Sequence, residues 1–129
     1  EMRALLDTNA AIYSWIEPEK LSEAARRVIE AQENQLFFSQ VSILEITLKN
    51  KLGKLPLPDK PEHYLPARIE AFSLNFLPLE NEDIYNIGEL PEIHKDPFDW
   101  LLLCIAKRLK LPIISSDQKF SQYPVKVVW

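Results

Sequence analysis

The chain is poor in cysteine and has no long hydrophobic run. Its 129 residues include a single cysteine, Cys104, which excludes an internal disulfide. Neither His63 nor His94 has a cysteine or histidine at ligand spacing, so a zinc site is disfavoured. No apolar stretch approaches the roughly 18 residues that cross a bilayer. We therefore expect a chain whose stability comes from an apolar core.

Basic residues are outnumbered, and a targeting segment is not evident. Fifteen basic and nineteen acidic residues give a formal net charge of −4, which is not typical of a nucleic-acid-binding protein. If four carboxylates are gathered in one pocket, however, the rest of the chain is neutral. The start, EMRALLDTNA, lacks the basic region and cleavage site of a signal peptide, which predicts a cytoplasmic protein. The length and the 47% hydrophobic content predict one domain over residues 1–129.

Short apolar segments alternate with helical patterns along the chain. The segments with the character of buried strands are 3–7, 36–39, 76–79, 112–115 and 125–129. The segments with a helical pattern are 9–15, 21–32, 42–52, 63–72, 82–88 and 97–110. Strands separated by helical crossovers predict a mostly parallel sheet with helices on both faces. The expected fold class is therefore α/β, a three-layer α/β/α sandwich.

Two aspartates directly follow predicted strands. Asp7 ends the segment RALLD, and Asp117 follows the segment PIISS. In an open parallel sheet, ligands bind beyond the carboxyl ends of the strands. We therefore expect the Asp7 and Asp117 carboxylates to meet at one edge of the sheet.

Two further acids, Glu45 and Asp99, lie near the starts of predicted helices. Each has a possible structural role. Glu45 could complete a capping box with Ser42 or pair with Lys49 one turn later. Asp99 could simply interact favourably with the positive end of the helix dipole.

The neighbours of these two acids in helical projection are apolar. They are Val41, Leu48 and Leu52 for Glu45, and Leu102, Leu103 and Ala106 for Asp99. An inward-facing charge needs a partner, and few basic residues are nearby to supply one. Four carboxylates at one edge would repel one another, and a bound divalent cation is the usual solution. An all-oxygen ligand set predicts Mg²⁺ or Mn²⁺, which can activate water for phosphodiester hydrolysis.

Three polar residues beside these acids are expected to support the site. Asn9 and Ser116 could orient ligands or water, although Asn9 could instead cap a helix and Ser116 could bond backbone in a turn. Asp96 precedes Pro97, and a residue before proline favours the extended conformation of an N-cap. We therefore expect Asp96 to cap the helix that carries Asp99.

Four segments, taken in order, resemble PIN-domain ribonucleases, specifically the VapC-like toxins of bacterial and archaeal toxin–antitoxin pairs. They are LLDTNA at 5–10, SQVSILEITLKNKLGKL at 39–55, HKDPFDWLLLCIA at 94–106 and ISSDQKFSQYPVKVVW at 114–129. The resemblance covers almost the whole chain. It implies a PIN-like fold, RNA cleavage, a small antitoxin partner and a homodimer. It also implies that Mg²⁺ or Mn²⁺ is held by Asp7, Glu45, Asp99 and Asp117. Trp100 departs from the family pattern, which commonly has a basic residue there.

Other functions fit the residues less well. Aspartyl-phosphate phosphatases need a second aspartate two residues after the first, where this chain has Asn9. Receiver domains need an aspartate after a middle strand, and neither LFFS nor FLPL is followed by one. A catalytically silent PIN-like scaffold that binds RNA or a protein is the alternative that stays open. If the chain binds RNA, contacts are expected from Lys49, Lys51, Lys54 and Lys95, which otherwise form a solvated surface.

Overall fold

Strands and helices alternate until the last two strands, as expected from the sequence. The computed structural model describes every residue from Glu1 to Trp129. The strands are β1 (Arg3–Leu6), β2 (Gln35–Ser39), β3 (Asn75–Leu77), β4 (Ile113–Ile114) and β5 (Val127–Val128). The α-helices are α1 (Thr8–Ile16), α2 (Glu23–Glu30), α3 (Gln40–Lys51), α4 (Pro61–Ala71), α5 (Asn81–Asn86) and α6 (Pro97–Leu109). Short 3₁₀ turns are η1 (Pro18–Lys20), η2 (Ile87–Glu89) and η3 (Gln118–Gln122).

The five strands form one parallel sheet in the order β3-β2-β1-β4-β5. Leu5 of β1 is aligned with Phe37 of β2 on one side and with Ile113 of β4 on the other. From β1 the chain builds outward in one direction to β2 and β3, and later returns to add β4 and β5. The carboxyl ends of β1 and β4 therefore form the topological switch point, where open α/β sheets bind ligands.

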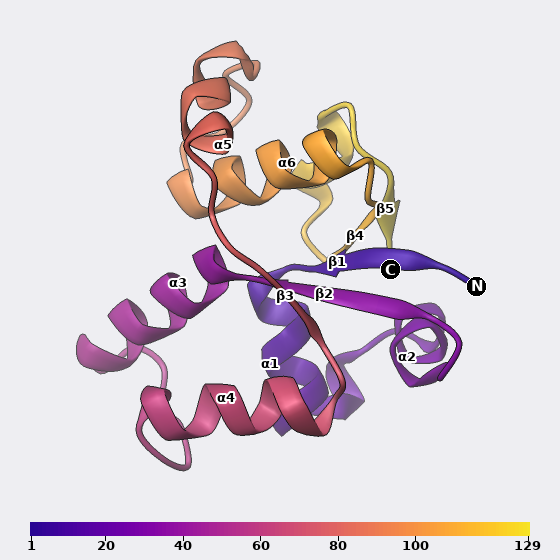
Figure 1. Cartoon of the computed structure of the whole chain (residues 1–129), viewed down its shortest axis with the longest axis vertical. Helices are drawn as coiled ribbons and strands as arrows, with labels where there is room; N and C mark the ends of the chain where they lie inside the picture. The colour runs from indigo at the N-terminus through magenta and orange to yellow at the C-terminus, as the bar shows by residue number, and fades with distance from the viewer.

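Helices cover both faces of the sheet, which confirms the predicted three-layer α/β/α sandwich. Alternate residues of β1 point to opposite faces: Ala4 and Leu6 pack in one core with residues of α1, α2 and α4, and Leu5 packs in the other with residues of α6. Figure 1 shows α1, α2 and α4 on one side of the sheet and α5 and α6 on the other. The connection from β3 to α5 carries the chain between the two sides.

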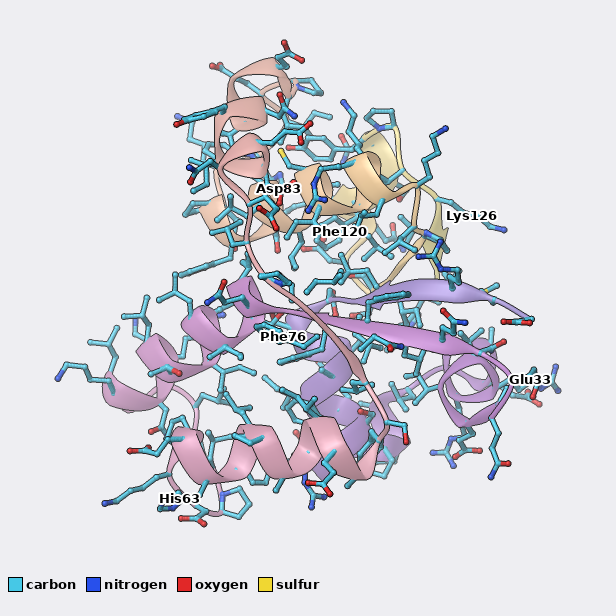
Figure 2. All side chains as sticks on the ribbon, in the orientation of Figure 1. Glu33, His63, Phe76, Asp83, Phe120 and Lys126 are labelled. Carbon is cyan, nitrogen blue, oxygen red and sulfur yellow. The ribbon has the colours of Figure 1, made fainter.

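The second core is built around α6 and is closed by residues after β4. Leu102, Leu103, Ile105 and Ala106 of α6 are buried, as expected for a helix that is apolar on most sides. Phe120 of η3 is buried with them (Figure 2). Asp83 of α5 is also fully buried and pairs with Arg108 of α6. This packing holds α6, whose first turn carries Asp99, against the sheet.

The boundaries of α3 differ from the prediction in a way that affects the site. The helix begins at Gln40 because Ser39, at the end of β2, is its N-cap and accepts a hydrogen bond from the Val41 N–H at 3.0 Å. The expected cap, Ser42, is therefore inside the helix. The helix ends at Lys51, one residue before the predicted end, and Gly53 follows it with a φ of +73°, the left-handed conformation that glycine favours.

The helix α4 begins two residues earlier than expected. It starts at Pro61, where a proline suits the first helical turn because its missing N–H would have no partner there. It also continues through Pro66.

No helix of this structure combines the length and the apolar character needed to span a membrane.

Candidate active site

The structure brings Asp7, Glu45 and Asp99 together at the carboxyl edge of the sheet. Asp7 follows β1, Glu45 lies in α3, which continues directly from β2, and Asp99 is in the first turn of α6. The charges of Glu45 and Asp99 both act on the Asp7 carboxyl group, and the charge of Glu45 acts on Asp99. Three segments that are far apart in the sequence thus contribute one carboxylate each to a shared site.

Asp7 is the most buried of the four predicted acids. Its residue is 5% exposed, and its Oδ1 accepts a hydrogen bond of 2.6 Å from the Ala10 N–H, so Asp7 is the N-cap of α1. Burial raises the pKa of Asp7 to about 7, and the charges of Asp99 and Glu45 act in the same direction. Hydrogen bonds from Ser115 and Ala10 oppose this rise. A carboxyl group with so high a pKa is typical of a functional site rather than of a simple helix cap.

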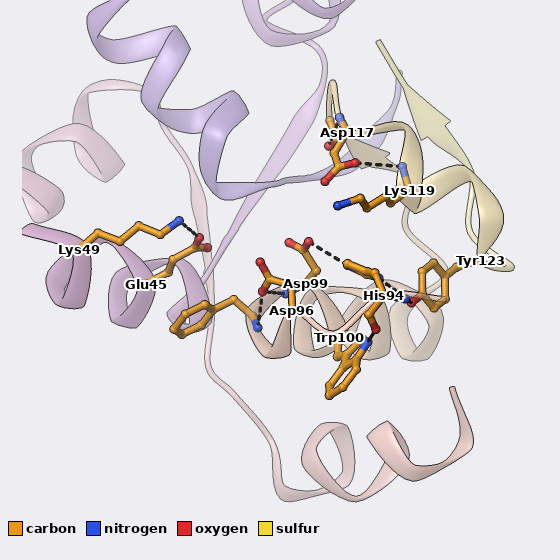
Figure 3. A network of polar contacts seen from close by, with 11 residues as sticks. Glu45, Lys49, His94, Asp96, Asp99, Trp100, Asp117, Lys119 and Tyr123 are labelled. Carbon is orange, nitrogen blue, oxygen red and sulfur yellow. Dashed lines mark hydrogen bonds and ion pairs between the residues drawn. The ribbon is translucent and has the colours of Figure 1, made fainter. Parts of the chain in front are cut away.

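Glu45 is buried and paired with Lys49. The Nζ of Lys49 lies 2.5 Å from Oε2 of Glu45 (Figure 3). This pair is one of the two structural roles considered for Glu45; the other is wrong, because Ser42 is hydrogen-bonded to Thr8 at 2.8 Å and does not cap the helix.

The predicted inward face of α3 is only partly correct. Val41 and Glu45 are buried, but Leu48 and Leu52 are 39% and 63% exposed. Since α3 extends away from the edge of the sheet (Figure 1), only its first turns are covered by the rest of the molecule. The expectation that few basic residues are available as partners is also wrong here, because Lys49 comes from the next turn of the same helix.

Asp99 is held by a histidine that sequence reasoning did not include in the site. Oδ2 of Asp99 lies 3.0 Å from Nε2 of His94, and both side chains are largely buried. Burial raises the pKa of Asp99 to about 6; the hydrogen bond from His94 lowers it, and the charges of Asp96 and Glu45 raise it. His94 lies in the loop before α6, where the sequence has no periodic pattern that would indicate its direction.

Asp96 has the predicted capping role. Its Oδ1 accepts hydrogen bonds from the N–H groups of Phe98 and Asp99, at 2.9 and 3.1 Å. The Asp96 backbone is extended, with φ −91° and ψ 110°, as expected for an N-cap before proline. The two aspartates of the DPFD sequence therefore have different positions: Asp96 is the N-cap of α6, and Asp99 lies within its first turn.

Asp117 lies on the opposite side of the site from Glu45 (Figure 3). It is half-buried, and its Oδ1 accepts a hydrogen bond of 2.9 Å from the Lys119 N–H, which makes it the N-cap of η3. Its charge is not among those that shift the pKa of Asp7 or Asp99. In the view of Figure 3, the exposed side chain of Lys119 is drawn between Asp117 and Asp99.

Asn9 and Ser116, the two small polar residues expected to support the site, are not buried beside the acids. Asn9 and Ser116 are exposed, and Asn9 lies inside α1 rather than at its cap. The buried residue is the preceding serine, Ser115, whose side chain lowers the pKa of Asp7 and whose Oγ accepts a hydrogen bond of 3.0 Å from the Asp117 N–H. Ser115 therefore acts on both strand-end aspartates. The alternation of side chains along β4 gives no signal that distinguishes Ser115 from Ser116, because Ile113 and Ile114 are both buried.

The residues at this edge fit a hard divalent cation chemically. The side chains of Lys49 and His94 each contact one oxygen of a carboxylate, which leaves the second oxygen available to another ligand. Burial and the charges of neighbouring acids disfavour the ionised forms of Asp7 and Asp99, and a bound cation would offset both effects. No three of the acidic, histidine or cysteine side chains are arranged as a finished set of metal ligands. Ligation of one ion would therefore require movement of these side chains.

Comparisons with known proteins agree with the fold. The PIN domain family matches residues 4–126. Similar solved structures include VapBC2 from Rickettsia felis bound to a promoter DNA fragment (TM-score 0.73, 15% identity, 98% of this chain and 97% of that chain). A second is DNA-bound VapBC from Salmonella typhimurium, with a TM-score of 0.69, 17% identity and a match over 98% of this chain and 97% of that chain. A third is a toxin–antitoxin complex from Klebsiella pneumoniae, with a TM-score of 0.65, 20% identity and a match over 98% of this chain and 96% of that chain. No curated protein sequence matches the chain. The family match covers nearly all of the sheet and every acid of the site, and the chain belongs to the PIN-domain family.

Proposed function

We propose that this protein is a metal-dependent endoribonuclease, the toxin of a type II toxin–antitoxin pair. The observation that carries the proposal is the convergence of Asp7, Glu45 and Asp99 at the switch point of the sheet, where their charges act on one another. Membership of the PIN-domain family supports a nuclease. The similar VapBC structures support the toxin assignment.

The residues proposed to hold Mg²⁺ or Mn²⁺ are Asp7, Glu45, Asp99 and Asp117. When bound, such an ion supplies activation of water and stabilisation of the leaving oxygen of a phosphodiester. The protein supplies the positions of the carboxylates: the Ala10 N–H holds Asp7, and His94 holds Asp99. Burial of Asp7 excludes bulk water from the centre of the site, which strengthens its electrostatic interactions.

RNA contact is proposed to come from lysines around the acids. Lys51, Lys54 and Lys95 are exposed, and Lys49 is partly exposed beside Glu45. Lys119 reaches the same region from the other side (Figure 3). Such positive charges beside a negatively charged centre attract phosphate groups, while the acids themselves keep the net charge of the protein negative.

A small antitoxin is proposed to cover the site and the apolar surface beside it. Leu44 and Leu48 of α3 and Leu52 at its C-cap are exposed at a spacing of four residues, which places them along one side of the helix. A groove of about 350 Å³ between α3 and α4 is lined by Ile43, Thr47, Pro61, Glu62, Leu65, Pro66 and Ile69. An exposed apolar surface of this kind is typical of a protein-binding region. The homodimer implied by the resemblance is proposed on the same basis.

The nuclease proposal is tested by incubating purified protein with a mixed RNA substrate and mapping the new RNA ends. We expect cleavage with Mg²⁺ or Mn²⁺, none with EDTA, and none by the Asp7→Ala variant. Cleavage that persists in Asp7→Ala would identify a contaminating nuclease. A folded wild-type protein that binds RNA but never cuts it with either metal would instead favour the silent scaffold.

The toxin proposal is tested separately by expressing the protein in cells with and without the product of a neighbouring reading frame. We expect growth arrest from the wild type alone and normal growth when the partner is present. Normal growth in cells that contain folded, active nuclease would refute the toxin assignment and leave the nuclease proposal intact.

A further inference from the structure

Both the backbone and the ring of His94 make hydrogen bonds to residues of the site and its surroundings. Its backbone N–H donates to the Tyr123 hydroxyl at 3.3 Å, and its carbonyl oxygen accepts a hydrogen bond of 3.0 Å from the Trp100 indole N–H. Its ring packs edge-on against the ring of Tyr123. The ring nitrogens contact Tyr123 at 2.7 Å and Asp99 at 3.0 Å. Residues from two other parts of the chain, the first turn of α6 and Tyr123 after η3, thus fix both the backbone and the ring of His94.

The contacts of the two His94 ring nitrogens determine which of them donates a hydrogen bond and which accepts one. An ionised carboxylate only accepts, so Nε2 of His94 must carry the proton that it donates to Asp99. In a neutral imidazole the other nitrogen, Nδ1, is then an acceptor. The Tyr123 hydroxyl donates to Nδ1 and accepts from the His94 N–H. Tyr123 therefore selects the tautomer of His94 that can hold Asp99.

We propose that His94 is a positioning residue for the Asp99 carboxylate and that Tyr123 fixes the tautomer His94 needs for this role. The proposal rests on the proposed function, in which Asp99 is a metal ligand. His94 contacts Oδ2 of Asp99 from the side opposite Glu45, as Figure 3 shows. The carboxylate is thereby held in one orientation, with its second oxygen left for a ligand. Trp100 supports the same arrangement by holding the His94 carbonyl group.

Hydrogen-bonded partners of this kind affect metal binding measurably. Removing a group that orients a metal ligand typically lowers metal affinity or activity by about 10- to 100-fold. A histidine that served only to anchor the loop would act through Tyr123 and would not change the metal affinity of a folded protein. The two roles therefore differ in which ring nitrogen is needed, Nε2 for positioning and Nδ1 for anchoring.

Glutamine and asparagine can separate these two roles. The side-chain amide N–H of glutamine lies near the position of Nε2 and can donate to Asp99, whereas asparagine has an oxygen near the position of Nδ1 and does not reach Asp99. We expect His94→Ala and His94→Asn to weaken Mn²⁺ binding by about 10- to 100-fold, and His94→Gln to restore most of the affinity. His63→Ala is the matched control, since His63 is exposed on α4. Binding is measured by titration of the protein with Mn²⁺, with folding checked by circular dichroism.

A second measurement tests the role of Tyr123 without any metal. The nitrogen resonances of His94 in the metal-free protein should be those of a ring protonated at Nε2, and Tyr123→Phe should produce a mixture of tautomers. Only two histidines need to be assigned. A ring protonated at Nδ1 in the wild type would overturn the proposal, because Nε2 could not then donate to Asp99.

The outcomes distinguish this inference from the proposed function. Unchanged Mn²⁺ affinity in folded His94→Ala, or rescue by asparagine rather than glutamine, would overturn the positioning role alone. If wild-type protein bound no Mn²⁺, the proposed metal-dependent function would fail, and the role of His94 in it would fail as well.

Discussion

At the scale of single residues, the site shows how neighbouring acids acquire different properties. Asp96 and Asp99 are three residues apart, yet Asp96 is bonded to the backbone of its own helix and Asp99 to His94. The cause is local: proline at position 97 forces Asp96 into the extended conformation of a cap, whereas Asp99 has the helical direction that points it at the sheet edge. The two can therefore be tested against each other.

Substitution of these two aspartates should separate stability from metal binding. Asp96→Asn keeps a capping oxygen and should retain most activity, and Asp96→Ala should cost about 1 kcal/mol of stability with metal affinity largely kept. Asp99→Asn should leave the metal-free protein at least as stable as the wild type, because one repelling charge is removed, while Mn²⁺ affinity and cleavage fall sharply. Chemical denaturation, Mn²⁺ titration and RNA cleavage measure the three quantities. If Asp96→Asn abolished cleavage and Asp99→Asn did not, the wrong aspartate would have been placed in the site.

The high pKa of Asp7 predicts how the metal-free protein responds to pH. Because its pKa is about 7 in the folded protein and ordinarily 3.8, the stabilising effect of the neutral carboxyl group is fully present below pH 4 and lost as the pH rises through 7. Asp99, with a pKa of about 6, acts in the same direction. In EDTA, Asp7→Asn should therefore be more stable than the wild type at pH 8, by roughly 3 to 5 kcal/mol, and this difference should shrink toward pH 4.

Denaturant unfolding at several pH values measures this difference. Asparagine is the suitable substitution because its side-chain oxygen can still accept the hydrogen bond from Ala10. A difference between Asp7→Asn and the wild type that stays constant between pH 4 and pH 8 would show that Asp7 titrates normally. Burial would then not raise the pKa of Asp7.

At the scale of the elements, α5 is attached to α6 by one buried ion pair. Nε and Nη2 of Arg108 contact the two carboxylate oxygens of Asp83 at 2.7 and 3.0 Å, and the Asp83 side chain is fully buried. Asp83 also accepts a hydrogen bond of 3.1 Å from the Glu80 N–H, which fixes the start of α5. A short helix such as α5 has little stability of its own, so this pair determines where it packs.

Loss of this ion pair should destabilise the fold without affecting the chemistry of the site. Arg108→Ala leaves the Asp83 charge buried without a partner, and we expect a loss of about 3 kcal/mol. Arg108→Lys keeps the charge but not the two-pronged contact, so its effect should be intermediate. Lys107→Ala, an exposed neighbour on the same helix, is the control and should change stability by less than about 0.5 kcal/mol. Urea denaturation measures the free energy of unfolding of each variant. A loss of stability in Arg108→Ala no larger than that in Lys107→Ala would contradict the prediction.

At the scale of the whole molecule, the site joins segments from both halves of the chain, so metal binding should stabilise the entire fold. A ligand that binds only the native state contributes about 2.7 kcal/mol at a hundredfold excess over its dissociation constant. We expect Mn²⁺ to raise the melting temperature at pH 7.5, and the rise to diminish toward pH 5 as Asp7 and Asp99 become protonated. The Asp99→Asn variant should show a much smaller rise. The same rise in wild type and Asp99→Asn would place the metal elsewhere on the protein.

Much of this architecture was predictable from local sequence. The order of strands and helices, the parallel sheet and the position of Asp7 after β1 follow from hydrophobic periodicity and from Ser22, Gly53 and Pro97 at helix ends. Such signals arise from interactions between residues a few positions apart, so they are present in the sequence itself. Family resemblance added the expectation that four distant acids serve one site, three of which the structure places within electrostatic reach of one another.

Only the tertiary structure determined which polar side chains accompany those acids. The contact between His94 and Tyr123 joins positions 29 residues apart, and Ser115 rather than Ser116 is buried against Asp7. The exposure of Leu48 and Leu52 likewise follows from where α3 extends beyond the sheet. These features depend on how the strands are ordered and how α6 packs on them, and long-range packing of this kind leaves no periodic signal in the sequence. The sequence therefore determined the elements and the acids, and the packing of the elements determined the partners of each acid.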